Sequence, residues 1–266
     1  MNYQNEINIE NKIIGNNQPC YIIAEIGVNH NGDLILAKKL IDAAIESGAD
    51  AVKFQKRNLE SLYRKEALEN PNSESQGFEI LLAELKKIEL SKEDYFDIVN
   101  YCKERKITFL CTPWDTPSVD FLEQLDTPAY KIASGDMTNF PLIKYISKRK
   151  KPMIISTGMS KIEEIEKMVD FVKMLNVQFV LLHANSTYPS PIESLNVSLI
   201  PEYAKKFGLL IGFSDHEIGI IGSLTAANIG AVIIERHITL DKKMKGLDHS
   251  SSLEPNEFKE MVNMIR

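Results

Sequence analysis

The chain has 266 residues, of which 44% are hydrophobic and 26% are charged, as is typical of one or two globular domains. This composition excludes disordered, collagen-like and small disulfide-rich proteins. Because 31 Lys and Arg face 37 Asp and Glu, a net charge of -6, we do not expect nucleic acid as a partner. The N-terminus lacks the features of a signal peptide and no apolar run reaches transmembrane length, so we expect a cytoplasmic protein without membrane contact. The three cysteines form no CxxC pair and are interpreted as small buried hydrophobes: Cys20, Cys102 and Cys111.

After Cys20, short apolar runs alternate with longer segments of helical period, which is the pattern of repeated βα units. Strands are expected at residues 21–26, 51–55, 108–111, 129–132, 153–156, 179–183, 209–213 and 231–235. Helices are expected at residues 34–46, 92–105, 161–175 and 218–228, and at 257–265 after Pro255. Eight strands close a parallel barrel of about 250 residues. We therefore predict an α/β fold, a single (β/α)8 TIM barrel over residues 1–266.

Two segments depart from the repeat. Residues 7–14, within an N-terminal extension over residues 1–18, are typical of a β-hairpin, closed by Gly15-Asn16-Asn17, that plugs the N-terminal face of the barrel. Residues 59–77 form a polar insertion that is long enough to act as a mobile lid over the opposite face.

The candidate catalytic residues are charged side chains at the C-terminal ends of strands, where the active sites of parallel barrels lie. Glu25 ends the first strand among apolar neighbours, either as half of a structural ion pair or as a group that handles a proton or a metal. Lys53 and Gln55 share one face of the second strand, and Lys131 ends the fourth. Two lysines with no acidic neighbour in their strands indicate an anionic ligand, the alternative being lysines that extend to solvent at the rim.

Small hydroxyl side chains end several other strands and can donate to phosphate or carboxylate oxygens. They are Thr112, Ser134, Ser156, Ser186 and Ser214. Together with the two lysines they predict a pocket for a small phosphorylated acid.

Two histidines, His216 and His237, follow the last two strands. If the barrel assignment holds, they can share a divalent metal whose coordination shell Glu25 or water completes. The alternative is a pair of ordinary rim histidines, because their spacing carries no metal signature. Asp248 and the loop at 185–188 add polar groups suited to a polyhydroxyl compound.

Ordered segments at these strand ends resemble the sialic acid synthase family, which includes N-acetylneuraminate, legionaminate and pseudaminate synthases. The segments are IAEIGVNHNG, VKFQ, TPWD, KIASGD, STGM, LHANSTYPSP, GFSDH, ERHIT and LDHSSSLEP. The resemblance covers residues 21–266 and implies a (β/α)8 barrel. It also implies condensation of phosphoenolpyruvate with an N-acylated mannosamine-type sugar, an N-acyl hexosamine, to a nine-carbon 2-keto acid and phosphate. The implied cofactor is a divalent metal, manganese in most members, with Mg²⁺ or Co²⁺ as alternatives.

The resemblance also assigns roles to residues of this sequence. It places the metal on His216 and His237 and makes Glu25, Lys53 and Lys131 catalytic. The implied phosphoenolpyruvate site comprises Lys53, Gln55, Thr112, Lys131, Ser134, Ser156, Ser186 and Ser214, and the implied sugar contacts are Tyr188, Asp136 and Asp248. Position 136 is Asp where some relatives have Glu, and position 186 is Ser where some have Asn.

The resemblance further implies a homodimer. Family members usually continue into a small antifreeze-like domain that contributes to the partner's sugar site, and we expect this domain to be absent from residues 1–266. Three explanations stay open: the sequence is truncated, a separate chain supplies the lid, or the acceptor needs no such lid. Two alternatives stay open: a related keto-acid synthase or aldolase that acts on another aldose, and a barrel that binds phosphoenolpyruvate without turnover.

Overall fold

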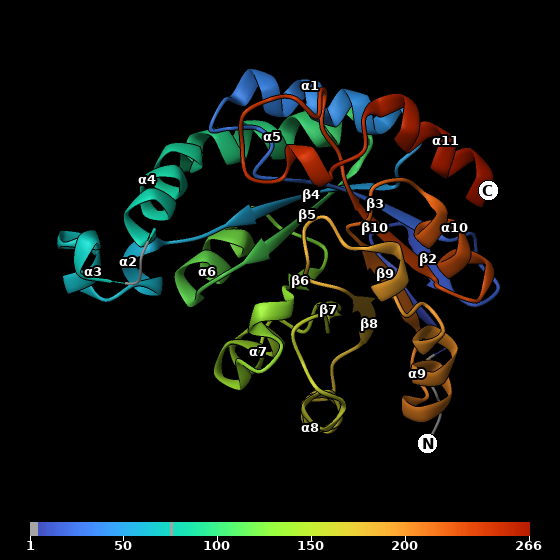
Figure 1. Cartoon of the computed structure of the whole chain (residues 1–266). Helices are drawn as coiled ribbons and strands as arrows, with labels where there is room; N and C mark the ends of the chain where they lie inside the picture. The colour runs from blue at the N-terminus through green and yellow to red at the C-terminus, as the bar shows by residue number, and fades with distance from the viewer. Residues whose placement is uncertain (1–4, 75–76) are drawn as a thin grey trace.

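In the computed structural model, which describes residues 5–74 and 77–266, eight parallel strands close into a barrel surrounded by helices (Figure 1). The strands are β3 (Tyr21–Gly27), β4 (Ala51–Lys56), β5 (Thr108–Pro113), β6 (Tyr130–Ile132), β7 (Met153–Ser156), β8 (Phe179–Ala184), β9 (Ile211–Asp215) and β10 (Ile233–His237). β10 pairs with both β9 and β3, which closes the ring. All the strands predicted from the apolar runs are confirmed, with ends that differ by at most two residues.

The outer layer consists of helices that follow the strands in the chain. They are α1 (Leu34–Glu46), α5 (Lys92–Arg105), α6 (Thr116–Gln124), α7 (Phe140–Ser147), α8 (Ile162–Met174), α9 (Leu199–Phe207), α10 (Ile221–Asn228) and α11 (Pro255–Ile265). Polar caps fix several starts: Asp33 accepts from the backbone N–H groups of the first turn of α1, and Ser91 and Asp94 form a capping box at α5. α10 begins three residues after the predicted start at 218, because Gly219 has a φ of +117°, which no helical residue adopts.

The N-terminal hairpin plugs the bottom of the barrel as predicted. It consists of β1 (Glu6–Ile9) and β2 (Lys12–Gly15). Ile7, Ile9 and Ile14 are buried in one apolar cluster with side chains of the barrel interior such as Ile23 and Leu110. The predicted closing turn at 15–17 is wrong, because Ile9 pairs with Lys12 and the chain reverses at the two residues between them. The first four residues of the predicted extension lie outside the described part of the chain.

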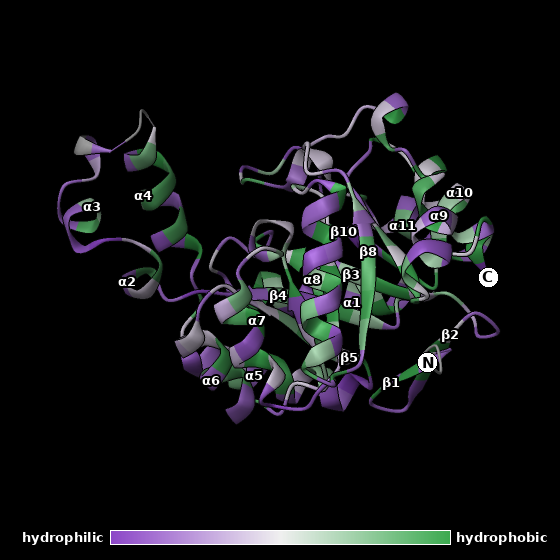
Figure 2. Ribbon diagram, turned by 90° about the horizontal axis from the view of Figure 1, so that it is seen from below, coloured by the Kyte–Doolittle hydropathy of each residue, from purple (hydrophilic) through white to green (hydrophobic). Residues whose placement is uncertain are grey.

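The insertion after β4 contains α2 (Leu59–Leu62), α3 (Lys65–Glu69), the 3₁₀ turn η1 (Pro71–Ser73) and α4 (Phe78–Ile88). It projects from one side of the barrel, at the left of Figure 2. Val28, Leu85 and Ile88 bury a small apolar cluster at its base. The expectation of a lid over the barrel face is therefore wrong for the described residues of 59–77, since the insertion extends sideways. Residues 75 and 76 of that range are not described.

Three further 3₁₀ turns shape the loops: η2 (Ser134–Asp136), η3 (Ile192–Ser194) and η4 (His249–Ser251). Cys102 and Cys111 are buried as predicted, but Cys20, which directly precedes β3, is partly exposed. Within the described ranges, no helix is both long enough and apolar enough to span a membrane.

Candidate active site

A cavity of about 440 Å³ opens at the C-terminal ends of the barrel strands, a size that suits a small ligand. Its lining comprises Glu25, Lys53, Gln55, Thr112, Trp114, Lys131, Ala133, Ser134, Gly135, Ser156, Met159, Ser186, Tyr188, Ser214, His216, Glu235 and His237. A second cavity of about 460 Å³ lies at the other end of the barrel, where no described lining residue carries a charge. The concentration of ionisable groups identifies the first cavity as the candidate site.

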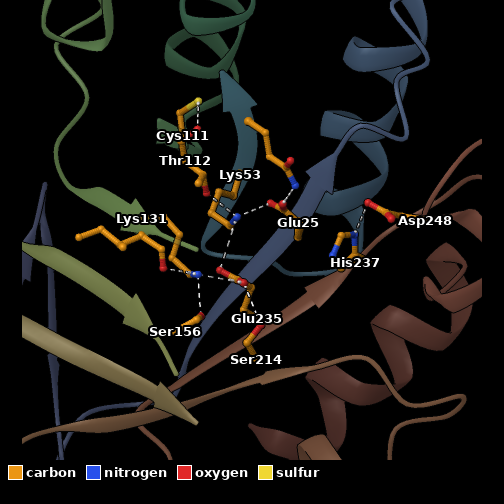
Figure 3. A network of polar contacts seen from close by, with 12 residues as sticks. Glu25, Lys53, Cys111, Thr112, Lys131, Ser156, Ser214, Glu235, His237 and Asp248 are labelled. Carbon is orange, nitrogen blue, oxygen red and sulfur yellow. Dashed lines mark hydrogen bonds and ion pairs between the residues drawn. The ribbon is translucent and has the colours of Figure 1, made fainter. Parts of the chain in front are cut away.

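The floor of this cavity holds two lysines and two glutamates in alternation (Figure 3). Lys53 Nζ lies 2.8 Å from Glu25 Oε2 and 3.8 Å from Glu235 Oε2. Lys131 Nζ lies 3.7 Å from Glu235 Oε1. All four side chains are buried, and buried charges need such partners because the loss of hydration is costly. The four formal charges cancel, so the floor is neutral as a whole while it presents two ammonium groups.

These pairings change the interpretation of the lysines. The sequence suggested ammonium groups without acidic partners, whereas Glu25 and Glu235 partner them from β3 and β10. Burial by itself would raise the pKa of Glu235, but Lys131 and Lys53 outweigh it and lower that pKa to about 2. Burial lowers the pKa of Lys131 to about 8 against the attraction of Glu235. For Lys53 the two carboxylates outweigh burial and raise the pKa.

Glu235 is the principal charged residue of the cavity that the sequence did not single out. Its position two residues before His237 in β10 indicates that both side chains lie on the same side of the strand, because residues two apart in a strand share a face. Trp114, just after β5, and Met159 also line the cavity and were not predicted.

Hydroxyl groups surround the charged floor. Thr112 Oγ1 accepts from Lys53 Nζ at 3.1 Å, and Ser156 Oγ accepts from Lys131 Nζ at 2.7 Å. Ser214 Oγ donates to Glu235 Oε1 at 3.0 Å. Each of these hydroxyls therefore lies next to an ammonium or carboxylate group. An anion that binds here can replace the present hydrogen-bond partner of the hydroxyl.

Two more predicted hydroxyls converge on the backbone of Gly158. Ser134 Oγ accepts from the N–H of Gly158 at 3.0 Å. A Cβ atom at position 158 would lie 2.5 Å from Ser186 Oγ and 3.0 Å from Ser134 Oγ. The absence of a side chain at Gly158 therefore lets both hydroxyls approach the same wall of the cavity.

The two histidines lie together above the charged floor, with ring centroids 5.6 Å apart. His216 Nδ1 lies 2.8 Å from the carbonyl oxygen of Asn185, which fixes Nδ1 as the protonated nitrogen and leaves Nε2 with its lone pair. Burial and the neighbouring His237 lower the pKa of His216 to about 3. Tyr188 packs on His216 with ring centroids 4.0 Å apart.

His237 faces a carboxylate from the following loop. Its Nδ1 lies 3.7 Å from Asp248 Oδ2, although Asp248 does not line the cavity itself. Among the described residues, no three His, Cys, Asp or Glu side chains are placed to hold a metal without further ligands. His216, with its Nε2 lone pair free, and His237, 5.6 Å away between ring centroids, offer two ring nitrogens as ligands, so a metal held by this pair would need its remaining ligands from water and substrate.

The structure brings twelve of the predicted residues to the cavity wall and leaves two outside it. Asp248 contacts His237 from behind, as described above. Asp136, at the end of η2, accepts from Asn139 Nδ2 at 3.0 Å, and its side chain is not part of the cavity wall. Burial raises the pKa of Asp136. The 3₁₀ turn directs this carboxylate toward the start of α7.

Comparison with known proteins gives a consistent assignment. The NeuB family model matches residues 40–266. Human N-acetylneuraminate-9-phosphate synthase is 43% identical over 95% of this chain and 71% of its own length. N,N'-diacetyllegionaminic acid synthase of Legionella pneumophila is 41% identical over 95% of this chain and 73% of its own length. The N-acetylneuraminic acid synthetase of Leptospira borgpetersenii, solved with citrate, is 35% identical with a TM-score of 0.89, covering 98% of this chain and 87% of that one.

The family match spans most of the barrel, and relatives above 40% identity cover nearly the whole chain. The chain belongs to the NeuB family.

Proposed function

We propose that the chain condenses phosphoenolpyruvate with an N-acylated mannosamine-type sugar to form a nine-carbon 2-keto acid and inorganic phosphate. The observation that carries the proposal is the neutral floor of two lysines and two glutamates beside a pair of histidines in one cavity. Related chains named as synthases of N-acetylneuraminate-9-phosphate and diacetyllegionaminic acid support the same class of product.

In this proposal, phosphoenolpyruvate binds on the floor of the cavity. Its phosphate and carboxylate accept from Lys53 and Lys131, which hold both negative groups and offset their charge. The hydroxyls of Thr112 and Ser156 already accept from these two lysines, and Ser214 donates to Glu235 beside them. Ser134, Ser186 and Gln55 complete the walls.

Glu25 is the proposed base. Its two oxygens have separate partners: Oε1 accepts from Gln55 Nε2 at 2.9 Å, and Oε2 lies 2.8 Å from Lys53 Nζ. This carboxylate orients and deprotonates the water that adds to C2 of the donor after the methylene carbon has attacked the sugar aldehyde. The proton of this water passes to the carboxylate of Glu25, and the former aldehyde oxygen takes up a proton to become a hydroxyl. The adduct then breaks its C2–O bond to phosphate, which leaves, and the C2 hydroxyl loses its proton to become the keto group.

We further propose that His216 and His237 hold a divalent metal, Mn²⁺ in the first instance, with Mg²⁺ or Co²⁺ as alternatives. When bound, such a metal acts as a Lewis acid toward the sugar aldehyde. The residues themselves orient this end of the cavity: Asn185 fixes the ring of His216 through its carbonyl oxygen, and Asp248 faces Nδ1 of His237. Tyr188, half-exposed beside both rings, is the proposed contact for the sugar hydroxyls.

From the family membership we further propose a cytoplasmic homodimer. Size-exclusion chromatography with light scattering tests the dimer.

The reaction is tested by phosphate release from phosphoenolpyruvate with Mn²⁺ and a panel of N-acyl mannosamines and other aldoses. We expect release that requires sugar and metal and that is lost in Glu25→Gln. Product mass separates a sialic-acid-type product from that of a keto-acid synthase or aldolase acting on another aldose. Binding of phosphoenolpyruvate without phosphate release in the presence of any of the sugars would contradict the proposal. It would indicate a barrel that binds phosphoenolpyruvate without turnover.

A further inference from the structure

The amide of Gln55 connects the proposed base to a buried arginine that does not line the cavity. Gln55 Nε2 donates to Glu25 Oε1 at 2.9 Å, and Gln55 Oε1 accepts from Arg57 Nη2 at 2.6 Å. Arg57 is 8% exposed and follows β4 directly, and it is absent from the cavity wall. The three side chains therefore form a chain of hydrogen bonds that begins outside the cavity and ends on the carboxylate.

This chain has a fixed direction because of its end groups. A guanidinium has only donors, and an ionised carboxylate has only acceptors. Between them an amide has one satisfactory orientation, with its oxygen toward Arg57 and its NH₂ toward Glu25. The reverse orientation would place the amide oxygen against the carboxylate oxygen and the NH₂ against the guanidinium. Arg57 thus determines which end of Gln55 faces Glu25.

Arg57 is itself held in place from two sides. Its guanidinium carbon lies 5.5 Å from the centroid of the Trp114 ring. Arg57 also lies close enough to the carboxylate of Glu89, which pairs with Lys56, to lower the pKa of that carboxyl against the effect of burial. The next backbone N–H, of Asn58, donates to Asp115 Oδ2 at 2.6 Å. The loops after β4 and β5 and the segment after α4 therefore set the position of the guanidinium before any ligand binds.

We propose that Arg57 is a positioning residue of the condensation, which acts on Glu25 through the amide of Gln55. The inference rests on the proposed function for the role of Glu25. Arg57 lies outside the cavity wall, so the effect of removing it falls on the chemical step that Glu25 assists. Substrate binding on the floor depends on Lys53 and Lys131, which Arg57 does not contact.

Steady-state kinetics test this role with Arg57→Met, which keeps an unbranched, largely apolar side chain and removes the donors. We expect kcat to fall roughly tenfold to a hundredfold, as for a displaced catalytic group, with the KM for phosphoenolpyruvate unchanged. Arg57→Lys, which keeps a cationic donor, should recover part of kcat. The matched control is Arg64→Met, an arginine of the neighbouring insertion whose side chain is 76% exposed. A rise in KM at constant kcat would overturn the proposal, because it would mean that Arg57 supports substrate binding, directly or through Gln55, and not the chemical step assisted by Glu25.

A double variant separates positioning from a general loss of stability. If Arg57 acts through the amide, Arg57→Met should have no further effect on kcat in a Gln55→Leu background. Independent, additive losses in the double variant would contradict the proposed route.

A second measurement does not depend on turnover. In protein labelled with ¹⁵N-glutamine, the side-chain resonances of Gln55 are assigned by their loss in Gln55→Leu. They should shift in Arg57→Met and stay unchanged in Arg64→Met. Resonances that do not respond to Arg57→Met would overturn the inference even in an active enzyme. If the resonances respond but the chain releases no phosphate, the contact between Arg57 and Gln55 is confirmed and the proposed reaction is rejected.

Discussion

The carboxylate of Glu235 lies between the two lysines of the cavity, with Oε1 3.7 Å from Lys131 Nζ. Its other oxygen, Oε2, lies 3.8 Å from Lys53 Nζ, so a single buried side chain of β10 compensates cations from β4 and β6. Strands on different sides of the barrel thus contribute to one ion-pair network. An anionic ligand on the floor would replace Glu235 as the partner of these lysines.

We expect Glu235→Gln to destabilise the ligand-free protein by about 3 kcal/mol, since removal of one partner leaves buried lysines without compensation. Added phosphoenolpyruvate should stabilise the variant more than the original chain, because its negative groups replace the lost carboxylate. Urea unfolding with and without phosphoenolpyruvate measures both effects. The control is Glu202→Gln at an exposed position of α9. Equal stabilisation of both proteins by the ligand would contradict the expected exchange of partners.

The lowered pKa of Lys131 gives a defined pH dependence. Its value of about 8 in the folded chain lies below the ordinary 10.5, so between these values the unfolded chain binds more protons and stability rises with pH. Binding of the donor has the opposite trend, because a neutral amine no longer attracts an anion. We expect kcat/KM for phosphoenolpyruvate to fall as the pH rises through about 8.

The variant Lys131→Arg tests this assignment, since a guanidinium stays charged over the whole range. Any activity that remains in this variant should show no decline near pH 8 in the pH profile of kcat/KM. A decline at the same pH in the arginine variant would assign the titration to another group.

Asp248 is expected to act on the metal site through His237. Because a carboxylate that faces the second ring nitrogen holds a metal-binding histidine in place, Asp248→Asn should weaken Mn²⁺ binding by roughly tenfold to a hundredfold. His237→Asn should abolish it. Electron paramagnetic resonance of free Mn²⁺ during a titration measures the affinity, with Asp170→Asn on the exposed surface of α8 as the control. Unchanged affinity in Asp248→Asn would leave this carboxylate with a role toward the sugar alone.

Gly158→Ala should disturb the donor site without unfolding the barrel. The added methyl group would lie 2.5 Å from Ser186 Oγ and 3.0 Å from the carbonyl oxygen of Ala184, so the hydroxyl has to move. We expect about a tenfold loss of phosphoenolpyruvate affinity by calorimetry, comparable to one displaced hydrogen bond. Gly135→Ala, whose methyl group would lie 3.8 Å from Met159 Sδ, should lose less phosphoenolpyruvate affinity. Similar losses in both variants would exclude a specific role for the hydroxyls at Gly158.

Local patterns predicted the elements well and their connections less well. The apolar runs placed every barrel strand within two residues, because strands buried on both faces have a sequence signature of their own. α4 was missed although Leu82, Leu85 and Ile88 have helical spacing, because the polar stretch before it suggested a loop. The position of the insertion beside the barrel depends on apolar contacts with Val28, which lies far away in the sequence.

The sequence by itself determined the barrel and the inward side of each strand end, because alternation with a period of two fixes which residues share a face. It therefore identified Glu25, Lys53, Lys131 and the histidines as members of one cavity. Tertiary structure alone decided how these groups pair. Glu235 reaches the lysines through closure of the barrel, and Asp136 turns away because a 3₁₀ turn directs it to Asn139. Closure brings together side chains that are more than a hundred residues apart in the sequence. No local sequence pattern indicates contacts between residues so far apart in the chain.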